Sequence, residues 1–299
     1  MEQHFEHLSC IPYLENTEAS RYQTLDIWIP TRHQHGDSTH GYWIIFIHGG
    51  AWRDPDINAT NFAEKAVLDL ITSGVSQIIE GIASINYRLS PRTPSQPVPS
   101  GGHVGGEQQA MHPDHLNDVI SGIEYLQRKF RFGNRYILTG HSCGATLAYQ
   151  TLIRQTMDKT ETHAAPHAII GVAGLYDLPL LRDMDPMPPM CHQFLLAAFG
   201  SDETLWRDVS PATYGDFERL WPTGKLAVLV YCEDDEYVSP AQLNTMYHAL
   251  EIWGEKEGRL VKTLKLPGGH DEVWRTGSGL ASCVEKSINY LQDLSVSEA

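Results

Sequence analysis

The feature that most constrains the fold is a serine held between two glycines, in the sequence G-H-S-C-G at residues 140–144. An apolar run at 136–139 precedes it and a helical pattern at 145–153 follows it. This order predicts a strand, a sharp turn and a helix, with Ser142 at the apex of the turn. Glycine is expected on both sides because a Cβ there would collide with the neighbouring strand or helix. The sequence therefore predicts a nucleophilic serine on an α/β sheet.

A second glycine-containing turn follows the buried-type strand that ends at residue 47. Its sequence is H-G-G-A-W, which comprises His48, Gly49, Gly50, Ala51 and Trp52. Acyl transfer places negative charge on a carbonyl oxygen, and backbone N–H groups in a tight turn can stabilise that charge. We assign the oxyanion hole to the N–H groups of Gly50, Ala51 and Cys143. The alternative is that this turn merely ends a strand, but its position before the serine turn favours the oxyanion role.

A serine nucleophile also needs a base, and the base needs a group that orients it. The order expected along the chain is serine, acid, histidine. Four acidic residues at 233–236 follow the apolar run at 226–232. We prefer Asp235, which falls on the turn just beyond the strand end. Asp234 is the alternative, because a loop boundary is uncertain by a residue or two.

The expected base is His270. It follows the strand predicted at 261–266 and stands after Pro-Gly-Gly, on a flexible loop that leads into the last helix. A histidine in that position can reach the serine and act as its base. The alternative is that His270 has only a structural role. The predicted catalytic triad is therefore Ser142, Asp235 and His270.

Apolar runs alternate with helical patterns along the chain, which predicts an α/β fold with a mostly parallel sheet and helices on both faces. Strands are expected at 42–47, 81–87, 136–139, 167–173, 226–231 and 261–266, and helices at 61–73, 115–130, 145–157, 240–253 and 272–294. The alternating pattern at 21–29 predicts a strand at or near a sheet edge.

The 299 residues are expected to form a single domain. Residues 1–20 are interpreted as an N-terminal extension. Residues 178–211 are interpreted as a small cap-like excursion over the site, with a short apolar helix at 191–199. The Pro- and Gly-rich stretch at 90–113 is expected to be a loop, with an insert near 93–110.

The formal net charge of −15 argues against nucleic acid and anionic membranes as partners. The sequence contains no apolar run long enough to span a bilayer, and residues 1–6 have neither a basic start nor an apolar signal core. We expect a cytoplasmic protein whose partner is a small-molecule substrate. A homodimer is compatible with the sequence.

Cysteine and histidine usage does not indicate a metal site. The five cysteines are widely spread without C-x-x-C spacing, which fits reduced thiols. Cys143 is expected to pack inward and to be structural, although a cysteine nucleophile is the alternative. The fifteen histidines include no H-E-x-x-H motif. We therefore expect neither a metal nor a cofactor.

Several of these segments together resemble the fungal kynurenine formamidases, which are arylformamidases of the α/β-hydrolase superfamily. The resemblance covers roughly residues 20–295 and rests on these segments: H-G-G-A-W at 48–52, N-Y-R-L-S-P at 86–91, H-P-D-H at 112–115, G-H-S-C-G-A at 140–145, and the loops of Asp235 and His270. It implies an α/β-hydrolase fold that hydrolyses N-formyl-L-kynurenine to L-kynurenine and formate, in tryptophan breakdown toward NAD.

The two glycine motifs are shared with hormone-sensitive-lipase-like carboxylesterases, so a general short-chain carboxylesterase is the alternative function. Substrate specificity is expected to rest on Trp52 and on the stretches 112–114 and 174–178. Aromatic residues expected near the site are Trp52, Tyr87, Phe194, Phe199 and Trp274, and we predict substrate contact for Trp52. A non-catalytic hydrolase-fold receptor would lack a member of the triad, but all three are present in order.

Overall fold

A computed structural model describes residues 5–14, 20–31, 41–92, 108–157, 163–184 and 188–297. Eight strands form one sheet in the order β1-β2-β4-β3-β5-β6-β7-β8. The bounds are β1 (Phe5–Pro12), β2 (Thr24–Pro30), β3 (Tyr42–Ile47), β4 (Ile79–Ile85), β5 (Tyr136–His141), β6 (Ala168–Val172), β7 (Leu226–Cys232) and β8 (Leu260–Leu266). β1 pairs antiparallel with β2, and β2 pairs antiparallel with β4. The other six strands, in the spatial order β4-β3-β5-β6-β7-β8, run parallel to one another. The mostly parallel sheet predicted from the sequence is confirmed.

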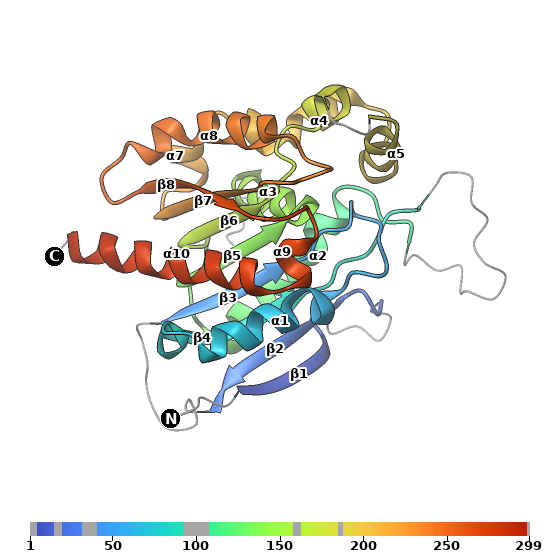
Figure 1. Ribbon diagram of the computed structural model, residues 1–299. Helices are drawn as coiled ribbons and strands as arrows, with labels where there is room; N and C mark the ends of the chain where they lie inside the picture. Colours follow the sequence, from blue (N-terminus) through green and yellow to red (C-terminus); the bar gives the residue numbers. More distant parts are fainter. Residues whose placement is uncertain are drawn as a thin grey trace.

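Helices cover both faces of this sheet (Figure 1). Their bounds are α1 (Ala59–Thr72), α2 (Asp114–Phe130), α3 (Cys143–Met157), α4 (Leu178–Met184), α5 (Pro188–Phe199), α6 (Glu203–Asp208), α7 (Phe217–Leu220), α8 (Pro240–Gly254), α9 (Glu272–Arg275) and α10 (Ser278–Ser297). Within β3, Ile45 and Ile47 pack into the core beneath α2, α3 and α8, whereas Ile44 and Phe46 pack into the core beneath α1 and α10. Burial on both faces explains the continuously apolar strands. In the described part of the chain, no helix is both long and apolar enough to cross a membrane.

The N-terminal segment contributes a strand that the sequence does not predict. β1 lies inside the stretch expected as an extension, and it forms the sheet edge beside β2. Its side chains are only partly buried or exposed, and Cys10 has a positive φ of 53° where the pairing register shifts. A half-exposed, bulged edge strand carries a weak periodic signal. The strand expected near the edge at 21–29 is confirmed as β2.

The C-terminal helical pattern is broken where the sequence predicts one continuous helix over 272–294. α9 ends at Arg275 and α10 begins at Ser278, and between them Gly277 has a φ of 83°. A Cβ at Gly277 would meet the backbone of Lys65 on α1. The break is a consequence of this close approach between distant segments, which local periodicity does not reveal.

The chain order brings the key loops to the carboxyl ends of the strands. β3 has β4 on one side and β5 on the other, so the loops after β3 and β5 leave adjacent strands, as at the ligand sites of open α/β sheets. Between β6 and β7, the described residues of the stretch 178–211 include α4, α5 and α6, and the helix expected at 191–199 begins earlier, at Pro188. Most of the expected insert at 93–110 lies outside the described residues, which exclude 93–107.

Candidate active site

Ser142 lies at the junction of β5 and α3 with a φ of 54°. Its N–H donates to the carbonyl oxygen of Val172 at 2.8 Å. A Cβ at Gly140 would meet the backbone of Gly144, and a Cβ at Gly144 would meet backbone carbonyls at the end of β3. The left-handed serine and its two glycines thus have the tight packing that the sequence pattern predicts.

The turn after β3 has an unusual backbone. Gly50, Ala51 and Trp52 have consecutive positive φ values of 97°, 48° and 58°. Such conformations are unfavourable for residues with a Cβ and persist only where the surroundings fix them. Here the N–H of Trp52 donates to Sγ of Cys143 at 3.3 Å, which connects the turn to the start of α3. Gly50, Ala51 and Ser142 line the same pocket, so the turn and the serine face a shared space.

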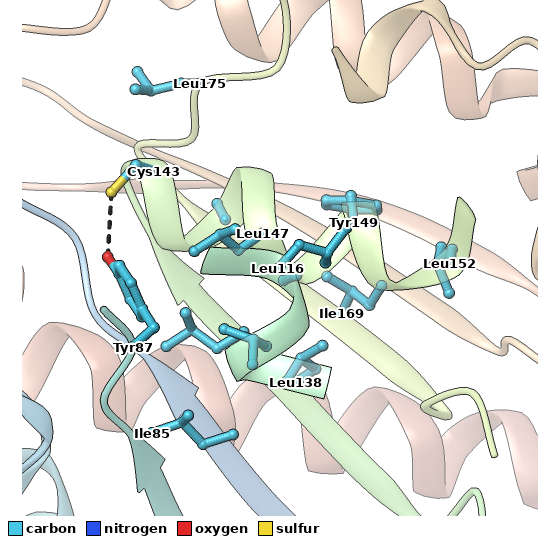
Figure 2. Close-up of a cluster of buried hydrophobic side chains, with 14 of the residues drawn as sticks. Ile85, Tyr87, Leu116, Leu138, Cys143, Leu147, Tyr149, Leu152, Ile169 and Leu175 are labelled. Carbon is cyan, nitrogen blue, oxygen red and sulfur yellow. Dashed lines mark hydrogen bonds between the residues drawn. The ribbon is translucent and has the colours of Figure 1, made fainter. Parts of the chain in front are cut away.

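The side chain of Cys143 points away from that pocket into the core. Figure 2 shows its sulfur facing the hydroxyl of Tyr87, at a distance of 3.5 Å. Burial raises the pKa of the Cys143 thiol to about 11, although the Tyr87 hydroxyl and nearby backbone N–H groups act to lower it. A neutral, fully buried thiol fits the structural role expected for this cysteine.

Tyr87 lies beneath the turn after β3 and is fully buried, rather than facing the site as the sequence analysis expects. Its hydroxyl lies 2.9 Å from the carbonyl oxygen of His48 and 3.1 Å from that of Gly49. Its ring stacks on the imidazole of His48, with centroids 4.3 Å apart. Burial lowers the pKa of His48 to about 4, so this histidine stays neutral near pH 7. Tyr87 therefore helps to fix the turn from below.

Asp235 and His270 come together from the loops after β7 and β8. The Nδ1 atom of His270 lies 2.9 and 3.1 Å from the two carboxylate oxygens of Asp235. Both side chains are more than nine-tenths buried. The N–H groups of Tyr237 and Val238 also donate to Asp235. Burial acts to raise the pKa of Asp235, but the hydrogen bond and charge of His270 and these N–H groups lower it overall, which favours the carboxylate.

The alternative acid does not make this contact. Asp234 is exposed, and its backbone N–H donates to the carbonyl oxygen of Gly268 at 3.0 Å. Two residues that the sequence analysis does not single out also hold the His270 loop. Glu236 accepts from the backbone N–H of His270 at 3.0 Å, and Nε2 of His141 lies 2.9 Å from the His270 carbonyl oxygen. Burial, and then the neighbouring His270, lower the pKa of His141 to about 3, so His141 is neutral.

These groups open into a pocket of about 410 Å³. Ser142, His270, Gly50 and Ala51 line it, and we call this part of the lining its floor. Further lining residues come from the loops after β3, β4, β6, β7 and β8 and from the helices α4 and α5: Arg53, Asp54, Ile57, Arg92, Leu175, Leu181, Met190, Cys191, Phe194, Tyr237, Val238 and Asp271. Most of these residues belong to no motif, so sequence reasoning misses them. The helices α4 and α5 of the 178–211 stretch contribute four of these lining residues.

Trp52 does not line the pocket. Its side chain is fully buried, with ring centroids 5.0 Å from Phe199 and 6.0 Å from Phe194. Of the aromatic residues expected near the site, only Phe194 is among the lining residues. Of the two stretches expected to carry specificity, 174–178 contributes Leu175 and 112–114 contributes none. Trp52 therefore supports Phe194 from behind, and its direct contact with substrate stays a prediction.

Three side chains beside the pocket also form a possible cation-ligand group. Potential ligand atoms of His141, His270 and Asp271 lie within 4.8 Å of one another. Each of these residues already makes other hydrogen bonds: His270 contacts Asp235, His141 contacts the His270 carbonyl, and Asp271 accepts from Nε1 of Trp274 at 3.0 Å. These bonds hold the three side chains in place, and chelation tests the expectation that no metal takes part.

Solved structures with a similar fold are esterases. A truncated carbohydrate esterase from gut microbiota matches with a TM-score of 0.69 and 17% identity, covering 99% of this chain and 98% of that one. Esterase B from Lactobacillus rhamnosis matches with a TM-score of 0.68 and 16% identity, covering 99% and 87%. A hormone-sensitive-lipase homologue, EstE7, from a metagenome library has a TM-score of 0.62 and 12% identity, covering 97% and 87%. At these identities the similarity concerns the fold, and the expected α/β-hydrolase fold is confirmed.

Sequence comparison is more specific. No family model matches the chain. Kynurenine formamidase avaC of Aspergillus versicolor is 32% identical over 296 residues, covering 94% of this chain and all of that protein. A kynurenine formamidase of Meyerozyma guilliermondii is 28% identical over 265 residues, covering 88% and 90%. Since the first of these similarities extends over the whole relative, the chain belongs to the kynurenine formamidase family.

Proposed function

We propose that the protein is a serine hydrolase that cleaves the formamide bond of N-formyl-L-kynurenine, releasing L-kynurenine and formate. The observation that carries this proposal is a single pocket that holds Ser142, His270 and the glycine turn, with His270 hydrogen-bonded to Asp235. Its membership of the kynurenine formamidase family supports the choice of an aryl formamide as substrate. The protein is thus an arylformamidase acting on a small molecule.

The proposed reaction begins at Ser142. Its hydroxyl oxygen attacks the formyl carbon while Nε2 of His270 takes the hydroxyl proton. Asp235 accepts a hydrogen bond from Nδ1 of His270, which orients the ring and stabilises the imidazolium. The N–H groups of Gly50, Ala51 and Cys143 donate to the developing oxyanion.

The tetrahedral intermediate then collapses and the C–N bond breaks. His270 passes its proton to the departing aryl amine, which leaves as L-kynurenine, and the formyl group stays on Ser142 as an ester. A water molecule then attacks this ester while His270 takes one of its protons, and His270 returns that proton to the Ser142 oxygen as formate leaves. Every proton in the cycle moves through His270, so these steps require no cofactor.

The alternative is a general short-chain carboxylesterase, which the esterase neighbours favour by fold. The same triad would serve both reactions, so the substrate decides between them. The five cysteines are free thiols and four of them are buried, which supports the proposed cytoplasmic location. A homodimer stays a prediction.

The test of the proposed function follows the absorbance of N-formyl-L-kynurenine with purified protein, with and without EDTA, beside p-nitrophenyl acetate. The proposal predicts efficient formamide cleavage that EDTA does not inhibit. Cleavage of the ester without cleavage of the formamide would support the carboxylesterase instead. Loss of formamidase activity on chelation, restored by zinc, would contradict the serine mechanism.

A further inference from the structure

One wall of the pocket carries charge, and an adjoining wall is apolar. Arg53, Asp54 and Arg92 lie among the lining residues on the charged side. Leu181 and Phe194, from α4 and α5, lie on the apolar side. The charged wall begins only three residues after Gly50 of the turn, so it stands next to the reacting centre. A ligand that fills this pocket would have an apolar part and an ionic part.

The charge of Arg92 is matched by neighbouring carboxylates. Its Nη2 atom lies 3.3 Å from a carboxylate oxygen of Asp54 and 3.5 Å from one of Asp56. About half of its side-chain surface is exposed, so solvent also screens this charge. Arg92 therefore needs no further anion.

Arg53 differs from Arg92 in this respect. Its Nη1 atom donates to the backbone carbonyl oxygen of Arg92 at 2.9 Å, and among the described residues no carboxylate forms an ion pair with it. It is half-buried, and its guanidinium carbon lies 5.8 Å from the centre of the Phe194 ring. Burial, and then the charge of Arg92, lower the pKa of Arg53, while the charge of Asp54 acts to raise it, and arginine stays protonated. The pocket thus contains a partly desolvated cation that an incoming anion would stabilise.

We propose that Arg53 binds the α-carboxylate of the substrate, so that the enzyme selects formylated aryl amino acids over aryl formamides that lack a carboxylate. This proposal rests on the proposed function, whose substrate carries an aryl ring and, at the other end, an amino-acid group with an amine and a carboxylate. The planar guanidinium has N–H donors beyond the one used on Arg92 and can pair with both oxygens of a carboxylate. Its place beside Phe194 brings the ionic site next to the apolar wall, where the aryl ring would pack.

The test compares two substrates that differ only in the carboxylate: N-formyl-L-kynurenine and its decarboxylated analogue, which keeps the formamide, the ketone and the amine. In Arg53→Gln we expect kcat/KM for N-formyl-L-kynurenine to fall about 10- to 100-fold, mainly through KM, as for a lost charge-assisted hydrogen bond. For the analogue we expect a change below about 3-fold. Arg53→Lys keeps the charge without the planar fork and should recover part of the loss.

The matched control is Arg128→Gln, which removes an arginine that is 60% exposed and pairs with Glu124 on α2. It should leave both substrates unaffected. Equal losses on the two substrates in Arg53→Gln, or an unchanged preference for the carboxylate, would overturn the proposed role of Arg53.

A second readout does not require formamide cleavage. L-Kynurenine and its decarboxylated analogue are compared as competitive inhibitors of p-nitrophenyl acetate hydrolysis. Tighter inhibition by L-kynurenine, lost in Arg53→Gln, would support the carboxylate site even if the wild-type protein failed to cleave formylkynurenine and the proposed function fell. Equal inhibition by both compounds in the wild-type protein would overturn the site.

Discussion

The floor and the charged wall of the pocket are built in different ways. On the floor, Ser142 and Ala51 have left-handed backbone conformations, and His270 is held by the buried carboxylate of Asp235. On the wall, Arg92 is about half exposed and Arg53 is half-buried, and flexible side chains provide the functional groups. The floor is thus fixed mainly by backbone conformation and buried hydrogen bonds. The wall is formed by side chains from loops that converge in space.

This difference separates chemistry from selectivity. Backbone geometry at the floor demands particular residues, because only glycine fits at 140 and 144 without a backbone clash. The wall makes no such demand, so it can change with the substrate while the reaction stays the same. Substitutions on the floor should therefore lower kcat, whereas substitutions on the wall should mainly raise KM.

The largest effect is expected at the floor, in Ser142→Ala. Removing the hydroxyl abolishes the attack on the formyl carbon, so kcat should fall about 10³-fold or more. Alanine fits the space of the serine, and the melting temperature should stay close to that of the wild type. Steady-state kinetics and a thermal melt check both statements. A variant that keeps more than about a tenth of wild-type kcat would rule out the covalent mechanism.

The second prediction compares neighbouring acids on the loop after β7. Asp235→Asn should lower kcat about 10²- to 10⁴-fold, because His270 loses its orienting carboxylate. Asp234→Asn, at an exposed position without this contact, should change kcat by less than about 2-fold. Kinetics on both purified variants decide the assignment. Reversed phenotypes would make Asp234 the acid.

The third prediction concerns acid stability. Burial lowers the pKa of His48 to about 4. Burial, followed by the nearby His270, lowers the pKa of His141 to about 3. Below the ordinary histidine pKa of about 6.5, these two histidines bind protons in the unfolded chain but not in the folded protein. The contribution of these histidines to the free energy of unfolding is therefore fully present above pH 6.5. It is lost as the pH falls toward 4, by about 1.4 kcal/mol per pH unit for each histidine.

Urea unfolding at several pH values between about 7.5 and 5 measures this slope. His248, which is exposed, provides the control. His248→Gln should leave the slope unchanged. A free energy of unfolding that stays constant over this interval would show that the buried histidines are not held neutral by the fold.

The smallest effect is expected at the apolar wall. Met190 on α5 lines the pocket and is only partly buried, so Met190→Ala removes contact area without opening a deep cavity. KM for N-formyl-L-kynurenine should rise about 3- to 5-fold, with kcat within about 2-fold of wild type. Leu68→Ala, at a position 57% exposed on α1, is the apolar control and should change neither constant. A large fall in kcat with unchanged KM would place Met190 with the floor.

The same contrast explains what the sequence reveals. The α/β fold is predictable because strands buried on both faces, such as β3, read as continuous apolar runs. The floor is predictable because its glycines and its chain order follow from backbone geometry. β1 escapes prediction because its burial is partial, and the break at Gly277 because it depends on Lys65 of α1. Arg53 escapes because its role depends on which loops converge in space, and no local pattern encodes that.

The account depends most directly on the formyl-enzyme intermediate. N-formyl-L-kynurenine with a radiolabelled formyl carbon is mixed with excess enzyme, quenched in acid during turnover and digested for peptide analysis. The account predicts label on the peptide that contains Ser142, and none in Ser142→Ala. Labelled formate released by the wild type with no labelled protein at any quench time, or label on Cys143, would contradict it.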